Sequence, residues 1–362
     1  MKKGCFILLF AFLFCSAAFA AQPDTETGLF EIPPAWQQTM DEAPLTAQEF
    51  RSMSLRDLWD FFSSQLKGTV QAPIRLAARL AGLLVLAGVV KSLCSEKALS
   101  GLGTSFDMIV AVSVFLLCSP LLLQMIQDLK ASLENCRTYL AVFIPVFTSV
   151  MVSCGQAGTA AVYGGLFLGF ANLIAALLCN FGVPILQLLL VLNACGIMET
   201  PVDFSALTRG IAKWGRWLLT FCATIFGTLL TLQSVFAQST DTLALKTGKF
   251  LLSSSIPVVG KAVSDAMGSV LAGVKLLKGS VGFAAILIIA LTFLPLIIKC
   301  VVSQFLFFIG EIIAGATGNA TCGKLLRGMT AYLQLQLAMV VFFSFVVVST
   351  TVLMILLGNG SA

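Results

Sequence analysis

Apolar residues fill tracts of this chain that are longer than any soluble fold requires. No Asp, Glu, Lys or Arg occurs from 138 to 198, and none occurs after Arg327. A helix that spans the bilayer needs about 20 consecutive apolar residues, so the first tract is long enough for about three spans. The pattern therefore predicts an all-α polytopic membrane protein.

The apolar segments predict about eight transmembrane helices, within a range of roughly seven to nine. They lie at 74–94, 106–126, 138–154, 159–179, 181–198, 214–237, 280–298 and 331–357. The first has a short apolar centre, because Arg75, Arg79 and Lys91 lie within it and must reach the interfaces. Residues 300–317 are expected as a ninth span or as a re-entrant segment, because Glu311 interrupts them.

The N-terminus has the pattern of a cleavable secretory signal peptide. Two lysines precede an apolar run at 5–14, and Ala18-Phe19-Ala20 supplies the small-x-small cleavage pattern. We expect cleavage after Ala20, with an uncleaved anchor or a lipoprotein signal at Cys15 as alternatives. The expected domains are a signal peptide (1–20), an extracytoplasmic polar and helical region (21–70) and a polytopic membrane domain (71–362).

Two further segments have the periodicity of amphipathic helices. Thr46 and Glu49 form a capping box ahead of an apolar face that ends at Leu66. This helix is expected to lie on the membrane domain, on the membrane surface or on a partner. Within 244–279, apolar residues recur at helical spacing from Val259 onwards, which predicts an interfacial helix.

Composition narrows the chemistry that this chain can perform. The chain has no histidine and 11% charged residues, with a formal net charge of +5, whereas soluble domains carry about 25% charged residues. The lack of histidine excludes His-based acid–base catalysis and His-ligated metals. The sequence has no Walker A motif, no CxxC pair and no basic patch interleaved with aromatic residues. We therefore expect no enzyme activity, cofactor, metal or nucleic-acid partner, and cysteines that serve packing.

Small residues at every fourth position form three stripes that would let helix backbones approach closely. The stripes are Ala157, Ala161, Gly165 and Gly169; Gly260, Ser264, Gly268 and Ala272; and Gly310, Ala314 and Gly318. Stripes of this kind serve packing within one chain or contacts between subunits. Both alternatives stay open from the sequence.

Polar residues at membrane depth are the remaining site candidates. They are Asn172, Gln187, Asn193, Lys299, Gln304 and Glu311, with Gln334 and Gln336 opening the last span. An amide in hydrocarbon needs a hydrogen-bond partner, so contacts between helices compete with a role in lining a conduit. Intramembrane carboxylates usually serve function, so Glu311 is expected to face a conduit or to pair with Lys299 or Lys324. Pairing with Lys299 would require a break in the helix between them.

The positive-inside rule gives a mixed answer on orientation. With an external N-terminus, the 199–213 loop lies inside with Arg209 and Lys213, and Lys97 and Lys299 also fall inside. The lysine-rich 238–279 segment falls outside, against the rule. Either long loops follow the rule weakly, or the span count is off by one.

Several local stretches form a familiar combination. One is 133–137 (LENCR), which runs into the long uncharged tract, and another is 248–260, which ends in Ser255-Ile256-Pro257-Val258-Val259-Gly260. The pattern continues through 263–266 (VSDA) and Leu277-Lys278 to a span that contains Leu294-Pro295. With these stretches, the chain resembles the stage III sporulation protein AE family. The resemblance covers nearly the whole mature chain, and the family has no catalytic signature.

The resemblance implies a multi-pass protein of the mother-cell membrane that surrounds the engulfed forespore. It implies a subunit of a channel-like export complex, whose partners are the other stage III sporulation proteins from AA to AH and, indirectly, forespore protein Q. The alternative is a stand-alone secondary transporter, which would use helices broken near the midplane, but no convincing inverted repeat is present. A third alternative, an intramembrane enzyme, lacks paired carboxylates and histidine.

Overall fold

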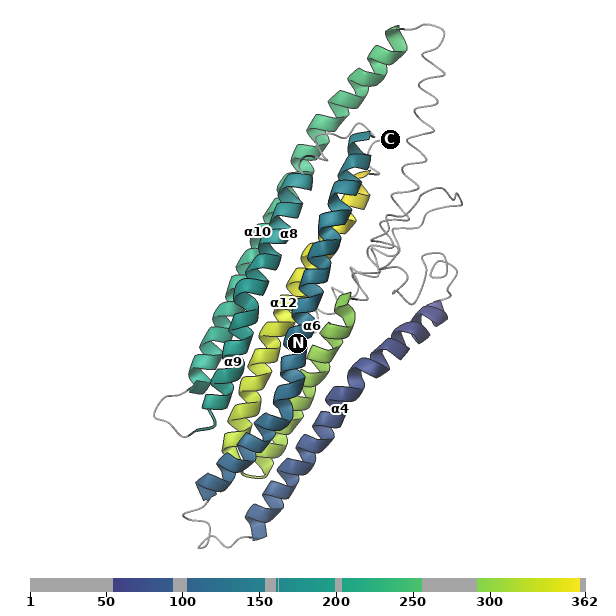
Figure 1. Cartoon of the computed structure of the whole chain (residues 1–362). Helices are drawn as coiled ribbons and strands as arrows, with labels where there is room; N and C mark the ends of the chain where they lie inside the picture. Colours follow the sequence, from purple (N-terminus) through teal and green to yellow (C-terminus); the bar gives the residue numbers. More distant parts are fainter. Residues whose placement is uncertain are drawn as a thin grey trace.

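The computed structural model describes residues 55–93, 103–153, 161, 163–198, 204–255 and 292–358, and all regular structure within them is helical (Figure 1). The signal peptide, the capping box at Thr46 and most of the expected interfacial helix lie outside these residues. The stripe of Gly260, Ser264 and Gly268 also lies outside them. These expectations stay predictions.

The described helices run alternately up and down along one long axis (Figure 1). The first are α4 (Leu55–Leu93), α6 (Gly103–Ser153), the π-helical turn η1 (Tyr163–Phe167), α8 (Leu168–Leu177), the π-helical turn η2 (Leu178–Gly182) and α9 (Val183–Cys195). They are followed by α10 (Phe204–Ser255), a helix at Thr292–Ala316, and α12 (Ala320–Gly358). We call Thr292–Ala316 the hairpin helix, because a short turn joins it to α12. The ends of α4, α9 and the hairpin helix lie beside the starts of α6, α10 and α12, at the lower end of Figure 1.

α12 is the central helix of the bundle. It packs against α6, α9 and α10, and 61% of its most apolar stretch is buried inside the protein, compared with 22% for α4. The sequence explains this position, because α12 has no charged residue after Arg327 and is therefore apolar on all sides. Its rings join the neighbouring helices: Phe343 meets Phe293 of the hairpin helix edge-on, and Phe345 meets Phe226 of α10.

Five apolar stretches among the described residues are long enough to cross a membrane, judged by length and composition. They are Gly68–Leu93, Ser105–Ala141, Gly165–Cys195, Thr292–Ala316 and Ala320–Val352. The prediction of an all-α protein with several candidate spans is therefore confirmed for the part of the chain that is described. The division of the chain into spans differs from the prediction, because one continuous helix takes the place of two expected spans.

The first such helix is α6, which contains the 106–126 segment and the 138–154 segment up to Ser153, so the loop expected between them is wrong. The polar segment stays helical because its apolar face continues through Leu129, Leu133 and Cys136, which are at most 4% exposed. On the outer face, Lys130 and Glu134 pair at i,i+4 spacing (3.8 Å), which favours the helix. Polar residues on one face therefore interrupt the apolar tract without ending the helix.

The 159–179 and 181–198 segments are likewise joined. The turn η2 connects α8 to α9, and Pro184 lies at the start of α9. Proline removes one backbone donor, and a π-helical turn accommodates that loss without ending the helix. The break expected near residue 180 is therefore a local irregularity in one continuous helix.

The third correction concerns 300–317, which is neither a separate span nor a re-entrant segment. These residues continue the hairpin helix up to Ala316. Lys299, which the topology prediction placed at an inner loop, therefore lies within this helix.

The hairpin helix ends in a Schellman motif, which explains its sharp reversal. The Asn319 N–H donates to the Ala314 carbonyl (3.0 Å), and the Gly318 N–H donates to the Gly315 carbonyl (3.2 Å). Gly318 has φ +69°, a left-handed conformation that glycine adopts most readily. Asn319 then caps α12, because its Oδ1 accepts a hydrogen bond from the Cys322 backbone N–H (3.1 Å). Gly318 is therefore a turn residue and does not continue the stripe of Gly310 and Ala314.

Two helices cross boundaries that the sequence suggested. α4 runs without a break from Leu55 through residue 70, with Pro73 inside it. α10 continues to Ser255, so it contains the expected span at 214–237 and the first part of the 244–279 segment. The 214–237 segment is not among the five stretches named above.

Candidate functional site

Polar groups gather where α12 meets α6. The Tyr332 hydroxyl donates to the Leu122 carbonyl (3.2 Å), and the Gln336 amide Nε2 donates to the Met125 carbonyl (2.7 Å). Both side chains of α12 are fully buried. Two side chains of α12 therefore form hydrogen bonds with the backbone of α6 inside the bundle.

The residues between these two reach other helices. The Gln304 amide of the hairpin helix donates to the Leu333 carbonyl (3.1 Å), and Arg216 of α10 donates to Gln334 Oε1 (2.6 Å). Gly215 of α10 lies so close to Leu335 that an added β-carbon would meet that side chain at 2.9 Å. We call Tyr332–Gln336 the α12 junction, because these five consecutive residues contact three neighbouring helices.

Lys299 lies inside the bundle in an ion pair with α6. Its ammonium donates to Asp128 Oδ2 (2.8 Å), and the lysine is only 9% exposed. The Asp128 side chain is 41% exposed, so the pair runs from the surface of the bundle into its interior. Asp128 was not a candidate from the sequence, because it fell in the loop expected between two spans.

Two buried polar atoms near this pair have no hydrogen-bond partner among the described residues: Ser303 Oγ and Gln336 Oε1. Ser303 is 1% exposed and Gln336 is 0% exposed. Other helical hydroxyls donate to a carbonyl one turn back, as Ser132 does to Asp128 (2.8 Å). A buried polar group without a partner costs about 1–3 kcal/mol, so these two atoms require an explanation.

Glu311 pairs with Arg327, and the expected pairing with Lys299 or Lys324 is wrong. Arg327 Nη2 and Nε donate to Glu311 Oε1 at 2.6 and 2.8 Å. Because the hairpin helix is continuous, Lys299 lies about 18 Å from Glu311 along its axis. The Arg327 side chain is 59% exposed, so this pair lies at the surface near the lower end of the bundle.

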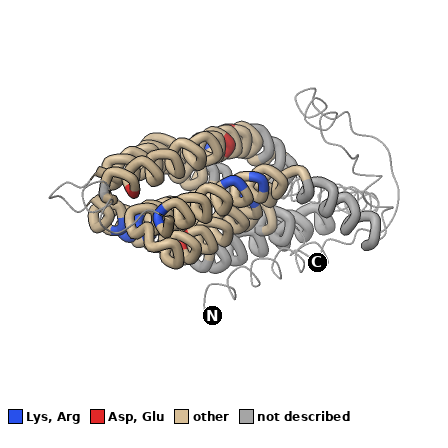
Figure 2. Tube along the Cα trace, turned by 90° about the horizontal axis from the view of Figure 1, so that it is seen from below, with Lys and Arg blue, Asp and Glu red and all other residues tan. Residues whose placement is uncertain are grey.

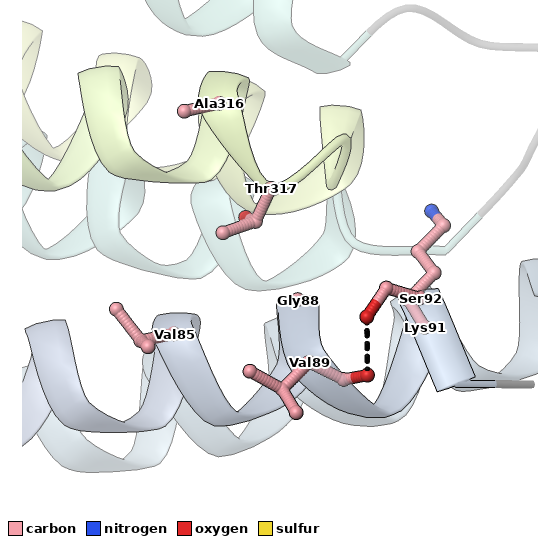
Figure 3. A pocket seen from close by; sticks show the side chains of 7 residues that line it. All are labelled: Val85, Gly88, Val89, Lys91, Ser92, Ala316 and Thr317. Carbon is pink, nitrogen blue, oxygen red and sulfur yellow. Dashed lines mark hydrogen bonds between the residues drawn. The ribbon is translucent and has the colours of Figure 1, made fainter.

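A second ion pair closes the same end. Lys91 of α4 donates to the Asp107 carboxylate at 2.9 and 3.0 Å and to the Gly318 carbonyl at 2.9 Å. A shallow hollow lies beside it, lined by Val85, Gly88, Val89, Lys91, Ser92, Ala316 and Thr317 (Figure 3). Thr317 lies over Gly88 there, and a β-carbon at Gly88 would meet its methyl group at 2.6 Å. The hollow is mostly apolar and its ammonium is already paired, so it is not a candidate ligand site.

The other polar candidates lie apart from the junction. Asn193 is buried, with its amide donating to the Leu189 carbonyl (2.8 Å) and its Oδ1 against Gly328 of α12. Asn172 is half-buried on α8, and Gln187 is exposed on α9. Of the six candidates, only Lys299 and Gln304, which are five residues apart on the hairpin helix, lie near the α12 junction. The six do not form a common lining within the described residues.

The small-residue stripes differ from one another. Gly310 packs against Leu80 of α4, where an added β-carbon would come within 2.5 Å, and Ala314 is fully buried. Gly165 and Gly169 are exposed, and a β-carbon on either would meet nothing within 4 Å. Further close approaches occur at glycines outside any stripe: Gly88, Gly182, Gly215 and Gly328. Because these four lie on separate helices without a regular spacing, the sequence offered no signal for them.

Charged residues are sparse along the described bundle (Figure 2). Within the described residues, no group of three or more Cys, Asp or Glu could hold a metal ion. The seven described cysteines are free thiols, and Cys118, Cys136, Cys300 and Cys322 are buried. The site is therefore a set of hydrogen bonds and ion pairs between apolar helices.

Comparison with known proteins identifies the family. The sequence model of the family described as stage III sporulation protein AE matches residues 38–358. This chain belongs to the stage III sporulation protein AE family. It is 26% identical over 213 residues to stage III sporulation protein AE of Bacillus subtilis strain 168, a match that covers 58% of this chain and 53% of that protein. No solved structure matches the chain significantly.

The match to the Bacillus protein spans only about half of that protein's length. The family membership confirms the resemblance seen in the sequence and indicates a role in sporulation.

Proposed function

We propose that this chain is an integral membrane subunit of a multi-subunit channel or export complex between mother cell and forespore, required for endospore development. Membership in a stage III sporulation family supports the developmental role. The proposed partners are the other stage III sporulation proteins from AA to AH and, indirectly, forespore protein Q. The proposed location is the mother-cell membrane around the forespore, and the proposed role is not catalytic.

Exposed apolar residues at both ends of α6 are the observation that carries this proposal. Ile109 is 64% exposed and Val152 is 52% exposed, and the exposed charged side chains of Lys130 and Glu134 lie between them. Ile109 and Val152 are about 65 Å apart along one helix, whereas the hydrocarbon core of a bilayer is about 30 Å thick. One bilayer therefore cannot cover both apolar ends of α6, and other protein subunits are a natural cover for one of them.

The separation of the polar candidates supports the same proposal. A stand-alone transporter needs a defined polar site near the midplane. Here Asn172 is half-buried on α8, Gln187 is exposed on α9, and Asn193 bonds within its own helix, whereas Glu311 pairs with Arg327 near one end. A passage between several chains fits this arrangement better than a passage through one chain.

Site-specific photo-crosslinking tests the proposal. A photoreactive residue is placed at Ile109, at Val152 or, as a buried control, at Leu129, and the full chain is irradiated in sporulating cells. We expect a protein adduct from Val152 or Ile109 that contains another stage III sporulation protein. If both exposed positions give only lipid adducts, the protein acts alone in the membrane and the transporter alternative is favoured.

A further inference from the structure

The register between α6 and the hairpin helix brings the two unpartnered atoms to one level. The helices are antiparallel (Figure 1), and the Asp128–Lys299 pair fixes their alignment. Ser303 follows Lys299 by one helical turn, so it lies at the level of residues 124–125 on α6. Gln336 reaches the same level, because its amide donates to the Met125 carbonyl. Ser303 Oγ and Gln336 Oε1 are thus both buried at about the same level along α6.

The hydrogen-bond donors and acceptors of Ser303, Gln336 and Lys299 determine which kind of ligand could bind between them. Gln336 Oε1 only accepts hydrogen bonds, the Lys299 ammonium only donates, and the Ser303 hydroxyl does both. The ammonium has three N–H groups, and Asp128 takes one of them. A ligand that satisfies all three side chains must both donate and accept hydrogen bonds, and a neutral ligand fits them best. The ammonium disfavours a cation, and Asp128 together with the amide oxygen disfavours an anion.

We propose that Ser303, Gln336 and Lys299 form a buried water-binding site between α6, the hairpin helix and α12. Buried waters in proteins typically make about three hydrogen bonds to such otherwise unpaired groups. The water extends the Asp128–Lys299 pair to α12 and makes one hydrogen-bonded unit of three helices. A shift of α12 against the other two helices then requires this unit to rearrange. The proposal stands on local geometry and is independent of the function proposed above.

X-ray hydroxyl-radical footprinting of the full-length protein in mild detergent tests this directly. Radicals form where water is bound, so a buried side chain is oxidised only when it lies next to water. Met125 contributes its carbonyl to the proposed site, and Met339 of α12 is an equally buried methionine that packs against Gly182. We expect Met125 to be oxidised at least several-fold faster than Met339. Equal and slow oxidation of both would show that the site is dry and would overturn the proposal.

A substitution at the site provides a second test of the bound water. If water is bound, Ser303→Ala removes one of its partners, lowers Met125 oxidation and lowers the melting temperature. If the site is dry, the same variant removes one unpaired hydroxyl, and the melting temperature stays the same or rises. That second result would also overturn the proposal. Should the variant fail to fold, the comparison of Met125 with Met339 in the unsubstituted protein decides alone.

Discussion

At the scale of single residues, burial decides how each polar group behaves. Lys299 and Asp128 share one ion pair, but their side chains are 11% and 41% exposed. Removing the carboxylate would leave an ammonium inside the bundle without its counter-charge. Removing the ammonium would leave a carboxylate that is partly at the surface. An unpaired Lys299 would therefore cost more stability than an unpaired Asp128.

We predict that Asp128→Asn destabilises the protein more than Lys299→Gln. The expected cost of Asp128→Asn is about 1–3 kcal/mol, below that of a fully buried pair because Asp128 is partly exposed. Combining the two substitutions should recover part of the loss, because no unpaired charge remains. The measurement is the melting temperature of the monodisperse protein in detergent. Equal losses from the two single variants would contradict the asymmetry.

A second residue-scale prediction concerns Gly328. A β-carbon there would collide with the Asn193 amide oxygen, whose side chain is held by the Leu189 carbonyl, whereas one at Gly182 would meet the flexible end of Met339. Gly328→Ala should therefore cost about 1–3 kcal/mol, and Gly182→Ala should cost less. Adding Asn193→Ala to Gly328→Ala should relieve the collision and give a non-additive double-variant cycle. Additive losses in thermal unfolding would mean that the two positions do not clash.

At the scale of elements, the sequence predicted where helices occur better than where they end. The apolar tracts identified the membrane-type helices, because burial among helices or in lipid requires them. The joins within α6 and at η2 were missed, because a polar face and a proline are ambiguous between a loop and a continuous helix. Among site residues, Lys299, Gln304 and Gln336 stood out as polar groups in apolar surroundings. Ser303 did not, because its importance depends on having no partner, which only the packing reveals.

The turn after the hairpin helix is the element whose geometry is most tightly set by one residue. We predict that Gly318→Ala costs about 1–2 kcal/mol, because a side chain is disfavoured at φ +69°. Gly323→Ala is the matched control on α12, where a β-carbon would meet nothing within 4 Å and alanine is the better helix former by about 1 kcal/mol. Thermal unfolding in detergent should therefore show a loss for the first variant and none for the second. A loss of the same size in both would refute the role of the left-handed turn.

At the scale of the whole molecule, the charges at the starts of α10 and α12 favour one orientation, and the lysine-rich segment at 238–279 favours the other. The starts of α10 and α12 carry Arg209, Lys213, Lys324 and Arg327, and both lie at the lower end of Figure 1. Applied to this end alone, the positive-inside rule predicts that it faces the cytoplasm. α4 runs down towards this end, so its start at Leu55 lies farther from it (Figure 1). A mature N-terminus outside the cytoplasm stays the prediction of the signal-peptide pattern.

Cysteine accessibility tests this orientation. In a cysteine-free variant of the chain, single cysteines are placed at Lys324, which is exposed at the lower end, and at Val152, which is 52% exposed near the end of α6. An impermeant thiol reagent should label Val152→Cys on intact cells, and it should label Lys324→Cys only after permeabilisation. Val152 lies near the end of α6 and Lys324 near the start of α12, and these two helices run parallel, so the positions lie at opposite ends and each serves as the control for the other. Labelling of Lys324→Cys on intact cells with protection of Val152→Cys would invert the orientation and place the mature N-terminus inside. Labelling of both on intact cells would mean that the bundle does not separate two compartments, and the proposed membrane role would fail with it.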